Sequence, residues 1–536
     1  MHGGSVPETI IATMSVTNTF ETRSLLGYLR ASVDRYPEAE AIVHGERRMR
    51  YGELWGDLSA LARYLREHGL ARGDRVALLL ENSYEYVVAY YAVLAAGGVV
   101  VALNAAARAR DLTNWIEHCE AGWLIAHREH GELGSMLAAL DSRVRIVAVG
   151  GALPDTRAHA VWSDILRDRG EAPAGVDLAP DATAAIIYTS GTTGRPKGVT
   201  LSHGNLASNV RSILAYLELS ANDRCLNVLP FYYSYGNSVL HTHLAVGGAL
   251  VLENSLAYVH NVVSKIAHEA VTGFAGVPST YALIASRVDM TQYDCRSLRY
   301  ATQAGGAMRP ALIEHFRRAW PKTRFFVMYG QTEATARLTY LPPERLEQKL
   351  GSAGIPIPDV RIEIRDETGA PVPVGSVGEI YASGPNVMQG YWNDPRATEQ
   401  VLRDGWLKTG DLALMDEDGY VYIQGRSSDM IKTGAHRINP ADIEEVIAEL
   451  DGVAEVAAVG VPDEILGQVV KAVIVAGAPT APTATAIKAH CHARLASYKV
   501  PRQVEFVAQL PKTASGKIRR YLLANETSER VRGNEH

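Results

Sequence analysis

A run of small residues between an apolar segment and a lysine is the part of the sequence best suited to chemistry. The string IIYTSGTTGRPKGVTLSH occupies residues 186–203, and its polar centre is followed by Lys197. Small residues leave backbone N–H groups and hydroxyls accessible, and together with a cation these groups bind polyphosphate. The string is not a Walker loop, because there a lysine follows the second glycine directly. A surface loop rich in glycine and threonine is the competing explanation for the small residues alone.

Four more motifs follow along the chain. They are YGQTE at 329–333, GWLKTGD at 405–411, GRSSDMIKTGAHRINPADIE from Gly425 and PKTASGKIRR from Pro511. In this order, across residues 186–520, the five motifs resemble those of the adenylate-forming superfamily, which includes acyl-CoA synthetases, peptide-synthetase adenylation domains and beetle luciferases. The string TSGTTGRPKG is that family's phosphate-loop motif almost letter for letter. Residues before 186 match the family only in general character.

The resemblance implies an acid–thiol ligase that uses ATP, Mg2+ and CoA. Family members join a carboxylate to the α-phosphate of ATP, release pyrophosphate, and then let a thiol attack the acyl-adenylate. A carboxylate and a phosphate repel each other in a low-dielectric cleft, so the site needs a divalent metal and fixed cations. By resemblance, Lys517 bridges the two anions, Thr332 contacts the α-phosphate and Glu333 holds Mg2+. On charge alone, the basic run that contains Lys517 would face solvent.

The nucleotide is expected to contact side chains and glycines of several motifs. By resemblance, Tyr329 stacks on adenine, Asp411 accepts hydrogen bonds from both ribose hydroxyls, and Arg426 donates to the same nucleotide. Gly305 and Gly306 match a family glycine turn, where a missing side chain lets the backbone approach the ligand. The implied nucleotide-binding set is Thr189, Ser190, Gly191, Thr192, Thr193, Lys197, Gly305, Gly306, Tyr329, Gly330, Asp411, Arg426 and Lys432.

The segment PFYYSYG at 230–236 indicates the class of acid. Many members carry a histidine where this chain has Tyr233, and amino-acid-activating members place an aspartate in this region. No Asp or Glu occurs between Pro230 and Leu252, so a free α-amino acid is not expected. Apolar and aromatic walls suit a fatty, alicyclic or aryl acid. The pocket residues expected from the sequence are Tyr232, Tyr233, Tyr235, Gly236 and Met328.

The thiol acceptor is expected to be CoA. The short stretch between Glu333 and Gly351 leaves no room for the insertion that marks fatty-acyl-AMP ligases, and no carrier-domain serine motif follows residue 520. By resemblance, the CoA channel is formed by Gly434, Ala435, His436 and Arg437. Two alternatives remain open: a stand-alone adenylating enzyme that loads a separate carrier protein, and a non-catalytic nucleotide-binding protein of the same fold.

Hydrophobic patterning indicates the elements that position these residues. From about 85 to 330, short β-branched runs alternate with helical stretches, the βα rhythm of layered, mostly parallel sheet. From about 355 the pattern changes to short strands with hairpin turns such as Asp418–Gly419, and after Gly425 to a small α+β unit. The fold class expected is α/β: layered sheets plus a small β-barrel-like subdomain, followed by a mobile α+β lid. We expect domains at 1–425 and 426–536, with Ser428 at the hinge in place of the usual charged residue.

Composition excludes several other classes of protein. The chain has 536 residues, with 53 basic and 59 acidic side chains, so no broad cationic surface for nucleic acid is expected. Four distant cysteines do not form a disulfide framework or a CxxC metal knuckle.

The N-terminus lacks a secretory signal, and glycines interrupt the uncharged run 86–103, so a cytoplasmic protein without a transmembrane segment is expected. The histidines near 241 and 490 lack the second distant pair that a zinc site needs. Monomer and homodimer are both compatible with the sequence.

Overall fold

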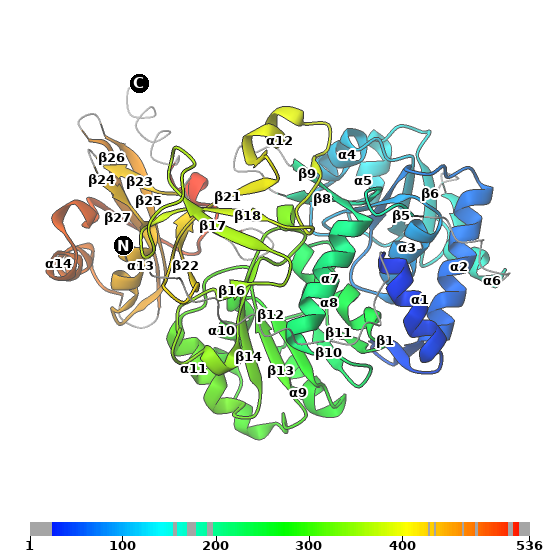
Figure 1. The fold of residues 1–536 in the computed structure, drawn as a ribbon, viewed down its shortest axis with the longest axis horizontal. Coiled ribbons are helices and arrows are strands. Elements are labelled where there is room, and N and C mark those ends of the chain that lie inside the picture. Colours follow the sequence, from blue (N-terminus) through cyan, green and yellow to red (C-terminus); the bar gives the residue numbers. More distant parts are fainter. Residues whose placement is uncertain are drawn as a thin grey trace, which may run out of the picture.

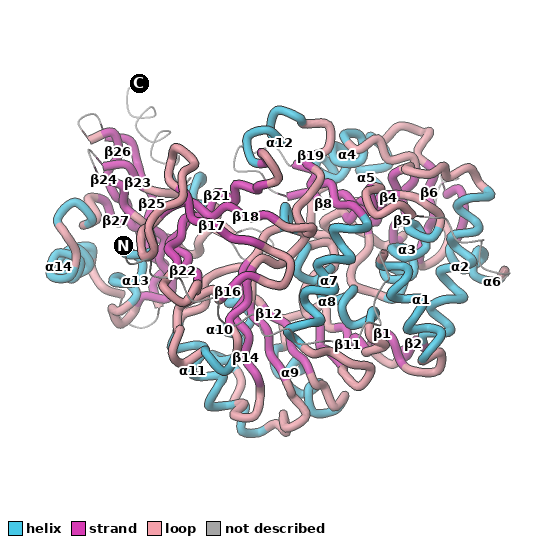
Figure 2. Tube along the Cα trace, viewed as in Figure 1, coloured by secondary structure: helices cyan, strands magenta, loops and turns pink. Residues whose placement is uncertain are grey.

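The structure is a computed structural model that describes residues 24–153, 158–168, 178–189, 197–426, 429–433, 436–463, 466–477, 481–512 and 518–524. The strands of these residues form four sheets. In Figure 1 the two larger sheets occupy the centre and right of the molecule, and the C-terminal sheet lies at the left. A third, antiparallel sheet lies between the C-terminal sheet and the rest of the chain, and Figure 2 shows the helices that surround the sheets.

The largest sheet has nine strands, and its six central strands are parallel. Its edges are antiparallel, since β2 pairs with β1 at one side and β15 pairs with β14 at the other. The parallel strands are short, apolar and buried, as expected where helices cover both faces. In spatial order they are β16 (Ile355–Pro356), β15 (Thr339–Leu341), β14 (Arg324–Tyr329), β13 (Tyr300–Gln303), β12 (Gly273–Gly276), β10 (Arg224–Asn227), β11 (Ala249–Leu252), β1 (Glu40–His44) and β2 (Arg47–Arg50).

The second large sheet has eight strands and ends in an antiparallel hairpin. β8 and β9 form this hairpin, and the two-residue strand β19 then pairs with β9 from a point nearly two hundred residues further along the chain. The polar segment 190–196 therefore joins two paired strands. In spatial order the strands are β19 (Gly390–Tyr391), β9 (Lys197–Ser202), β8 (Thr183–Thr189), β4 (Val99–Ala102), β3 (Arg75–Leu79), β5 (Trp123–His127), β6 (Arg145–Val149) and β7 (Ala158–Val161).

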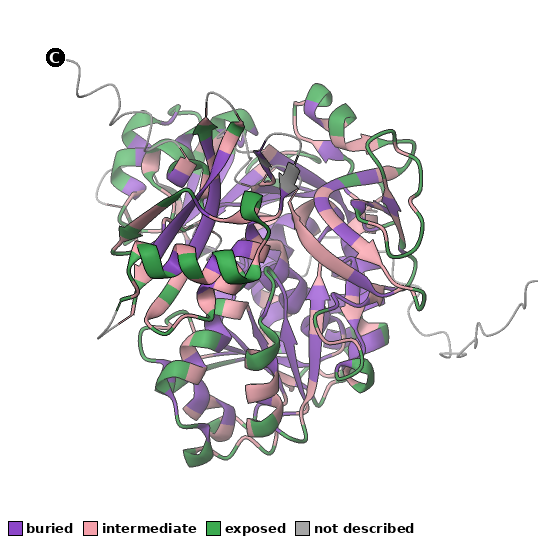
Figure 3. Cartoon of the chain, turned by 90° about the vertical axis from the view of Figure 1, so that its left-hand side faces the viewer, coloured by how far each residue is buried: buried purple, intermediate pink, exposed green. Residues whose placement is uncertain are grey.

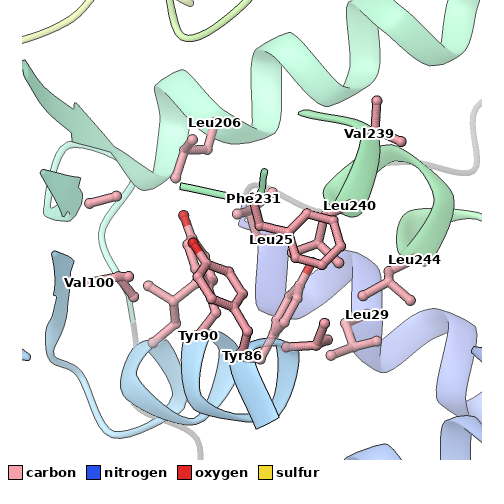
Figure 4. Packing of buried hydrophobic residues seen from close by; sticks show 14 of the residues in the cluster. Leu25, Leu29, Tyr86, Tyr90, Val100, Leu206, Phe231, Val239, Leu240 and Leu244 are labelled. Carbon is pink, nitrogen blue, oxygen red and sulfur yellow. The ribbon is translucent and has the colours of Figure 1, made fainter. Parts of the chain in front are cut away.

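Helices pack between and outside these two sheets. The cluster between them is formed largely by α1, α2, α3, α7 and α8, where Tyr86 and Tyr90 of α3 face Phe231 and Leu240 (Figure 4). Helices α9, α10 and α11 cover the outer face of the first sheet, and α4 and α5 that of the second. Figure 3 shows buried strands and helices whose outer faces are exposed. The helix bounds are α1 (Leu25–Arg35), α2 (Tyr51–Glu67), α3 (Tyr84–Ala95), α4 (Ala109–His118), α5 (Leu133–Ala139), α6 (Trp162–Arg167), α7 (His203–Leu217), α8 (Ser234–Ala245), α9 (Val259–His268), α10 (Pro278–Arg287), α11 (Pro310–Ala319), α12 (Pro395–Val401), α13 (Pro440–Ala448) and α14 (Ala484–Arg494).

Two smaller sheets complete the described part of the chain. The third sheet is antiparallel and contains the hairpin expected at Asp418–Gly419, where Gly419 has a φ of 82°. Its strands are β17 (Arg361–Arg365), β18 (Gly378–Ser383), β21 (Trp406–Met415), β20 (Leu402–Arg403) and β22 (Val421–Arg426). The C-terminal sheet packs against α13 and α14, and its strands are β24 (His436–Ile438), β23 (Ile431–Thr433), β26 (Gly467–Ala476), β25 (Val453–Asp463) and β27 (Gln503–Val507).

The structure agrees with the expected α/β class of layered sheets and adds two details. The βα rhythm of residues 85–330 builds two separate sheets, since β4 to β9 belong to the eight-stranded sheet and β10 to β14 to the nine-stranded one. The cap of α7 is Ser202, whose hydroxyl accepts from the Asn205 N–H, while the Asn205 side chain completes the capping box. No helix among the described residues is long and apolar enough to cross a membrane. The boundary at 425 stays a prediction; in the described chain Arg426 still belongs to the third sheet and Ile431 begins the C-terminal one.

Candidate active site

A cavity of about 1050 Å³ lies where the large sheets, the third sheet and the C-terminal segment meet. Residues that follow the carboxyl ends of β10, β12, β13 and β14 line it, as is usual for ligand sites in open parallel sheets. The polar and charged residues of its wall include Thr189, Lys197, Ser234, Asn254, Ser279, Thr280, Gln331, Thr332, Glu333, Arg337, Glu379, Gln400, Lys408, Thr409, Arg426 and Lys512. The apolar part is formed by Val228, Leu229, Pro230, Tyr233, Tyr235, Leu256, Val277, Ala304, Ala336, Val401 and Leu407.

The strands on either side of the expected phosphate loop reach this cavity. Thr189 ends β8 and Lys197 begins β9, so the residues on both sides of the loop line the cavity. The Lys197 ammonium lies 4.7 Å from the centroid of the Tyr391 ring. No salt bridge holds Lys197 among the described residues, which leaves this cation suited to an anionic ligand. Ser190, Gly191, Thr192 and Thr193 lie outside the described residues.

Glu333 is positioned by a phenol that no sequence motif indicated. It lies in a short 3-10 turn, Thr332–Ala334, that follows β14. The Tyr391 hydroxyl donates to Glu333 Oε1 at 2.9 Å, and the Glu333 carbonyl accepts from the Met388 N–H. Burial and then the neighbouring carboxylate raise the pKa of Tyr391, so this phenol stays a donor at neutral pH. A carboxylate oriented at the edge of a cavity fits Mg2+, which takes one or two carboxylates plus phosphate oxygens.

Asp411 is held on two sides in the third sheet. It is only 5% exposed, and Tyr329 donates to its Oδ2 at 2.7 Å. The Nε of Arg426, its partner in the β21–β22 ladder, lies 3.1 Å from Oδ1. Burial and then Asp411 raise the pKa of Tyr329 well above its ordinary value. The structure thus brings together three residues expected to bind one nucleotide, and Arg426 reaches the cavity wall.

Two of the expected glycines leave space that a side chain would fill. A Cβ on Gly330 would lie 2.1 Å from the Ala336 carbonyl oxygen, so no other residue fits this backbone. Gly305 lines the cavity with a φ of 87°, a conformation that favours glycine. The carbonyl of Gly306 accepts from the Gln303 side chain, and Gly306 itself does not contribute to the described wall.

The acyl pocket residues expected from the sequence divide into two groups. Tyr233, Tyr235 and Gly236 line the cavity. Tyr232 does not, although its ring lies 4.7 Å from that of Tyr233. Met328 lies behind the wall, where its sulfur accepts from a tyrosine hydroxyl of α7.

The structure says less about the predicted C-terminal site residues. Lys517, Gly434 and Ala435 lie outside the described residues, and for Lys432, His436 and Arg437 only the strand backbone is described. Lys512, in the same motif as Lys517, lines the cavity and forms an ion pair with Glu455 at 2.7 Å. The roles expected for the Lys517 side chain and the CoA channel stay predictions.

Sequence reasoning missed three polar residues of the site. Tyr391 follows Met388-Gln389-Gly390, and nothing local in that string shows that it reaches Glu333. Ser234 and Thr332 have hydroxyl oxygens 3.1 Å apart, which joins α8 to the turn after β14. Arg337 lines the same cavity, four residues after Glu333. The only available signal was its position next to the YGQTE motif.

The histidine pairs weighed for a metal have ordinary partners. His241 on α8 lies 2.9 Å from both the Tyr91 hydroxyl and the Asn237 side chain. His243 bonds the Val239 carbonyl and the Tyr300 hydroxyl, and both histidines are buried. His490 on α14 lies 3.0 Å from Glu449.

Comparison of the sequence with protein-family models shows which family the chain belongs to. A family model described as AMP-binding enzyme matches residues 29–392, and the model of the AMP-binding enzyme C-terminal domain matches residues 442–517. The chain belongs to the AMP-binding enzyme family. The match begins well before residue 186, so the family likeness covers more of the chain than the five motifs indicated.

Relatives of this AMP-binding enzyme are acyl-CoA ligases. Feruloyl-CoA synthase of an Amycolatopsis species is 36% identical over 90% of this chain and 94% of its own length. Long-chain-fatty-acid–CoA ligase of Bacillus subtilis is 31% identical over 94% of this chain and 95% of its own length.

Solved structures similar to this chain are also acyl-CoA ligases. Anthranilate CoA ligase bound to anthranoyl-AMP superposes with a TM-score of 0.86 at 26% identity, covering 94% of this chain and 98% of its own. o-Succinylbenzoate CoA synthetase from Bacillus subtilis, bound to ATP and a magnesium ion, gives a TM-score of 0.81 at 30% identity, covering 92% and 98%. These findings confirm the expected family, fold class and acid–thiol ligase activity, with ATP, Mg2+ and CoA as its cofactor and co-substrates.

Proposed function

We propose that this AMP-binding enzyme activates a carboxylic acid with a cyclic, aryl or alicyclic acyl group and transfers it to CoA in the cytoplasm. The observation that carries the proposal is that one cavity brings together charged and apolar residues from different segments. We call the part with Lys197, Glu333 and Arg426 the polar wall, and the part that follows β10 and β12, with Val228, Tyr233 and Val277, the apolar wall. The comparisons add support, since ferulate, anthranilate and succinylbenzoate ligases are among the relatives.

The polar wall is suited to the adenylation half-reaction. Lys197 carries a cation beside the expected phosphate loop, and the Asp411–Arg426 pair offers an acceptor and a donor where a ribose would bind. When bound, Mg2+ would neutralise phosphate charge while Glu333 holds it. The hydroxyls of Ser234 and Thr332 form the junction between the two walls, which is where a substrate carboxylate would meet a phosphate.

The apolar wall is suited to a ring. Aromatic side chains contribute large flat surfaces, and Val228, Leu229 and Val277 complete the wall beside Tyr233. No described carboxylate lines this wall, so an α-ammonium group would have no partner there. A long fatty chain is the competing substrate.

ATP–pyrophosphate exchange tests the proposal. Cinnamate, benzoate, cyclohexylpropanoate, phenylalanine and palmitate should be compared, followed by AMP and acyl-CoA formation with CoA. Exchange should depend on ring acids, and acyl-CoA should form with free CoA. Exchange with palmitate alone would contradict the proposal that the substrate is a cyclic acid. Transfer only to a phosphopantetheinyl carrier protein would contradict the proposal that CoA is the acceptor.

Lys517→Ala tests the predicted role of the C-terminal lysine. Removal of one electrostatic stabiliser should cut acid-dependent exchange by about a hundredfold. Lys488→Ala is the matched control, because Lys488 lies on exposed α14 and its ammonium donates to the Arg502 carbonyl. Equal exchange rates for the Lys517→Ala and Lys488→Ala variants would show that Lys517 has no role in adenylation.

A further inference from the structure

Arg337 is a buried cation in the wall of the acyl side of the cavity. It follows the turn that holds Glu333 and precedes β15, and it is only 2% exposed. It lines the main cavity and also a small void behind Tyr235. Its guanidinium carbon lies 4.7 Å from the centroid of the Tyr235 ring.

The partners of this guanidinium are all neutral. Its Nε donates to the Tyr216 hydroxyl and one Nη to the Ser238 hydroxyl, each at a long 3.3 Å. Its other terminal nitrogen, Nη1, is buried with no hydrogen-bond partner among the described residues. The fixed surroundings therefore leave one donor of a charged group unsatisfied.

Other arginines near the same sheets are compensated. Arg299 lies 2.9 Å from Asp223, and Arg224 lies 2.7 Å from both Glu40 and Glu269. Burying a charge without a charged partner costs free energy, and leaving a buried donor without a hydrogen bond adds to that cost. A buried guanidinium without a carboxylate beside a cavity is best explained by a partner that the ligand supplies.

The geometry of α8 places Arg337 away from the reacting end. Ser234 contacts Thr332 at the junction of the two walls, and Ser238, four residues further along the same helix, contacts Arg337. Four residues advance a helix by about 6 Å. The guanidinium thus lies about one helical turn along α8 from the hydroxyl of Thr332.

We propose that Arg337 is a specificity-determining residue that selects acids carrying an oxygen acceptor on the acyl group, remote from the reacting carboxylate. The proposal rests on the proposed function and narrows its substrate class to oxygenated cyclic acids. Rearrangement of the loosely held guanidinium would give the ligand oxygen a charge-assisted hydrogen bond, and the same cation would repel an ammonium group. A site built to hydrogen-bond a substrate oxygen rejects the analogue that lacks it, because its own donor is then left unpaired.

Pairs of acids that exchange one oxygen for a methylene test the proposal directly. The acids are cinnamates and 3-phenylpropanoates substituted at ring position 3 or 4. One pair compares a methoxy with an ethyl substituent, and the other compares an acetyl with an isopropenyl substituent. The two members of each pair differ little in size. The wild-type enzyme should prefer the oxygen member of at least one pair by tenfold or more in kcat/KM for exchange. Arg337→Met should reduce that preference to within about threefold, while KM for ATP stays unchanged.

Two further variants keep the result decisive. Arg324→Met is the matched control, since Arg324 begins β14 and pairs with Glu218 at the surface, and it should keep the preference. If Arg337→Met does not fold, Arg337→Lys keeps the charge and should retain part of the preference with altered ring position. An enzyme that turns over ring acids without preferring any oxygen member, or an Arg337→Met enzyme that keeps the preference, would overturn the inference. Turnover of palmitate without any ring acid would instead overturn the proposed function on which it rests.

Discussion

Replacing Tyr391 by phenylalanine isolates one hydrogen bond at the expected metal ligand. The substitution removes the hydroxyl that donates to Glu333 at 2.9 Å and keeps the ring whose face lies beneath the Lys197 ammonium. The cation–π contact is therefore preserved while Glu333 loses its anchor. The freed carboxylate can turn away from the cavity or toward the lysine, and either change weakens its hold on Mg2+.

The structure sets the expected size of the effect. A hydrogen bond to a charged group contributes about 1.5–3 kcal/mol, and the partial exposure of both residues places this one near the lower value. About 1.4 kcal/mol corresponds to a factor of ten in an equilibrium constant. Tyr391→Phe should therefore raise the Mg2+ concentration that half-saturates ATP–pyrophosphate exchange by roughly tenfold, while saturating Mg2+ restores most of the rate.

The assay is exchange measured across a Mg2+ titration, with thermal unfolding recorded for each variant. Tyr381→Phe is the matched control, because Tyr381 lies on β18 with its ring beneath Arg365, and its loss should leave the titration unchanged. A Tyr391→Phe enzyme with the wild-type Mg2+ dependence would show that the hydrogen bond does not position Glu333. A rate that stays low at all Mg2+ concentrations would refute the reasoning as well, since it would place the phenol in chemistry and not in metal binding.

Two other predictions concern stability. Gly330→Ala should destabilise the fold and abolish exchange, because the new Cβ would meet the Ala336 carbonyl oxygen at 2.1 Å. Gly56→Ala, in the interior of α2 with nothing within 4 Å, should instead raise the melting temperature slightly, because alanine favours helix more than glycine does, and should leave exchange unchanged. Burial lowers the pKa of His203, His241 and His243 to about 4, 3 and 4, so below the ordinary value near 6.5 the unfolded chain binds protons that the folded chain does not. The free energy of unfolding should therefore fall between pH 7 and pH 5 by up to about 2 kcal/mol per histidine, measured by denaturant titration, and His203→Gln should lessen that slope.

The motifs predicted chemistry better than they predicted architecture. YGQTE and GWLKTGD are far apart in the chain, yet the Tyr329 hydroxyl donates to Asp411 at 2.7 Å, while the roles of both residues toward a nucleotide stay predictions. The pattern of the sequence located the hairpin at Gly419 because a turn depends on local residues. It did not separate the two large sheets, since strand pairing depends on contacts distant in sequence.

The sequence did not indicate Tyr391 and Arg337 for two different physical reasons. Tyr391 reaches Glu333 from a two-residue strand, and a strand this short has no periodic signal. Arg337 resembles any charged residue after a motif, and only its burial among neutral partners sets it apart. Met328 was expected in the pocket as an apolar side chain, but it is buried and its sulfur accepts from the Tyr216 hydroxyl, so it does not line the cavity.

The pairing of β19 with β9 also determines where the chain can be divided. Gln389 and Trp392 each donate a backbone hydrogen bond to β9, and the first family match ends at Trp392. A shortened protein that stopped before residue 388 would expose the β9 edge beside the phosphate-loop segment and lose Tyr391. Unpaired edges of this kind recruit strands from other molecules, so such a fragment should aggregate, whereas one extended past Trp392 keeps the edge covered.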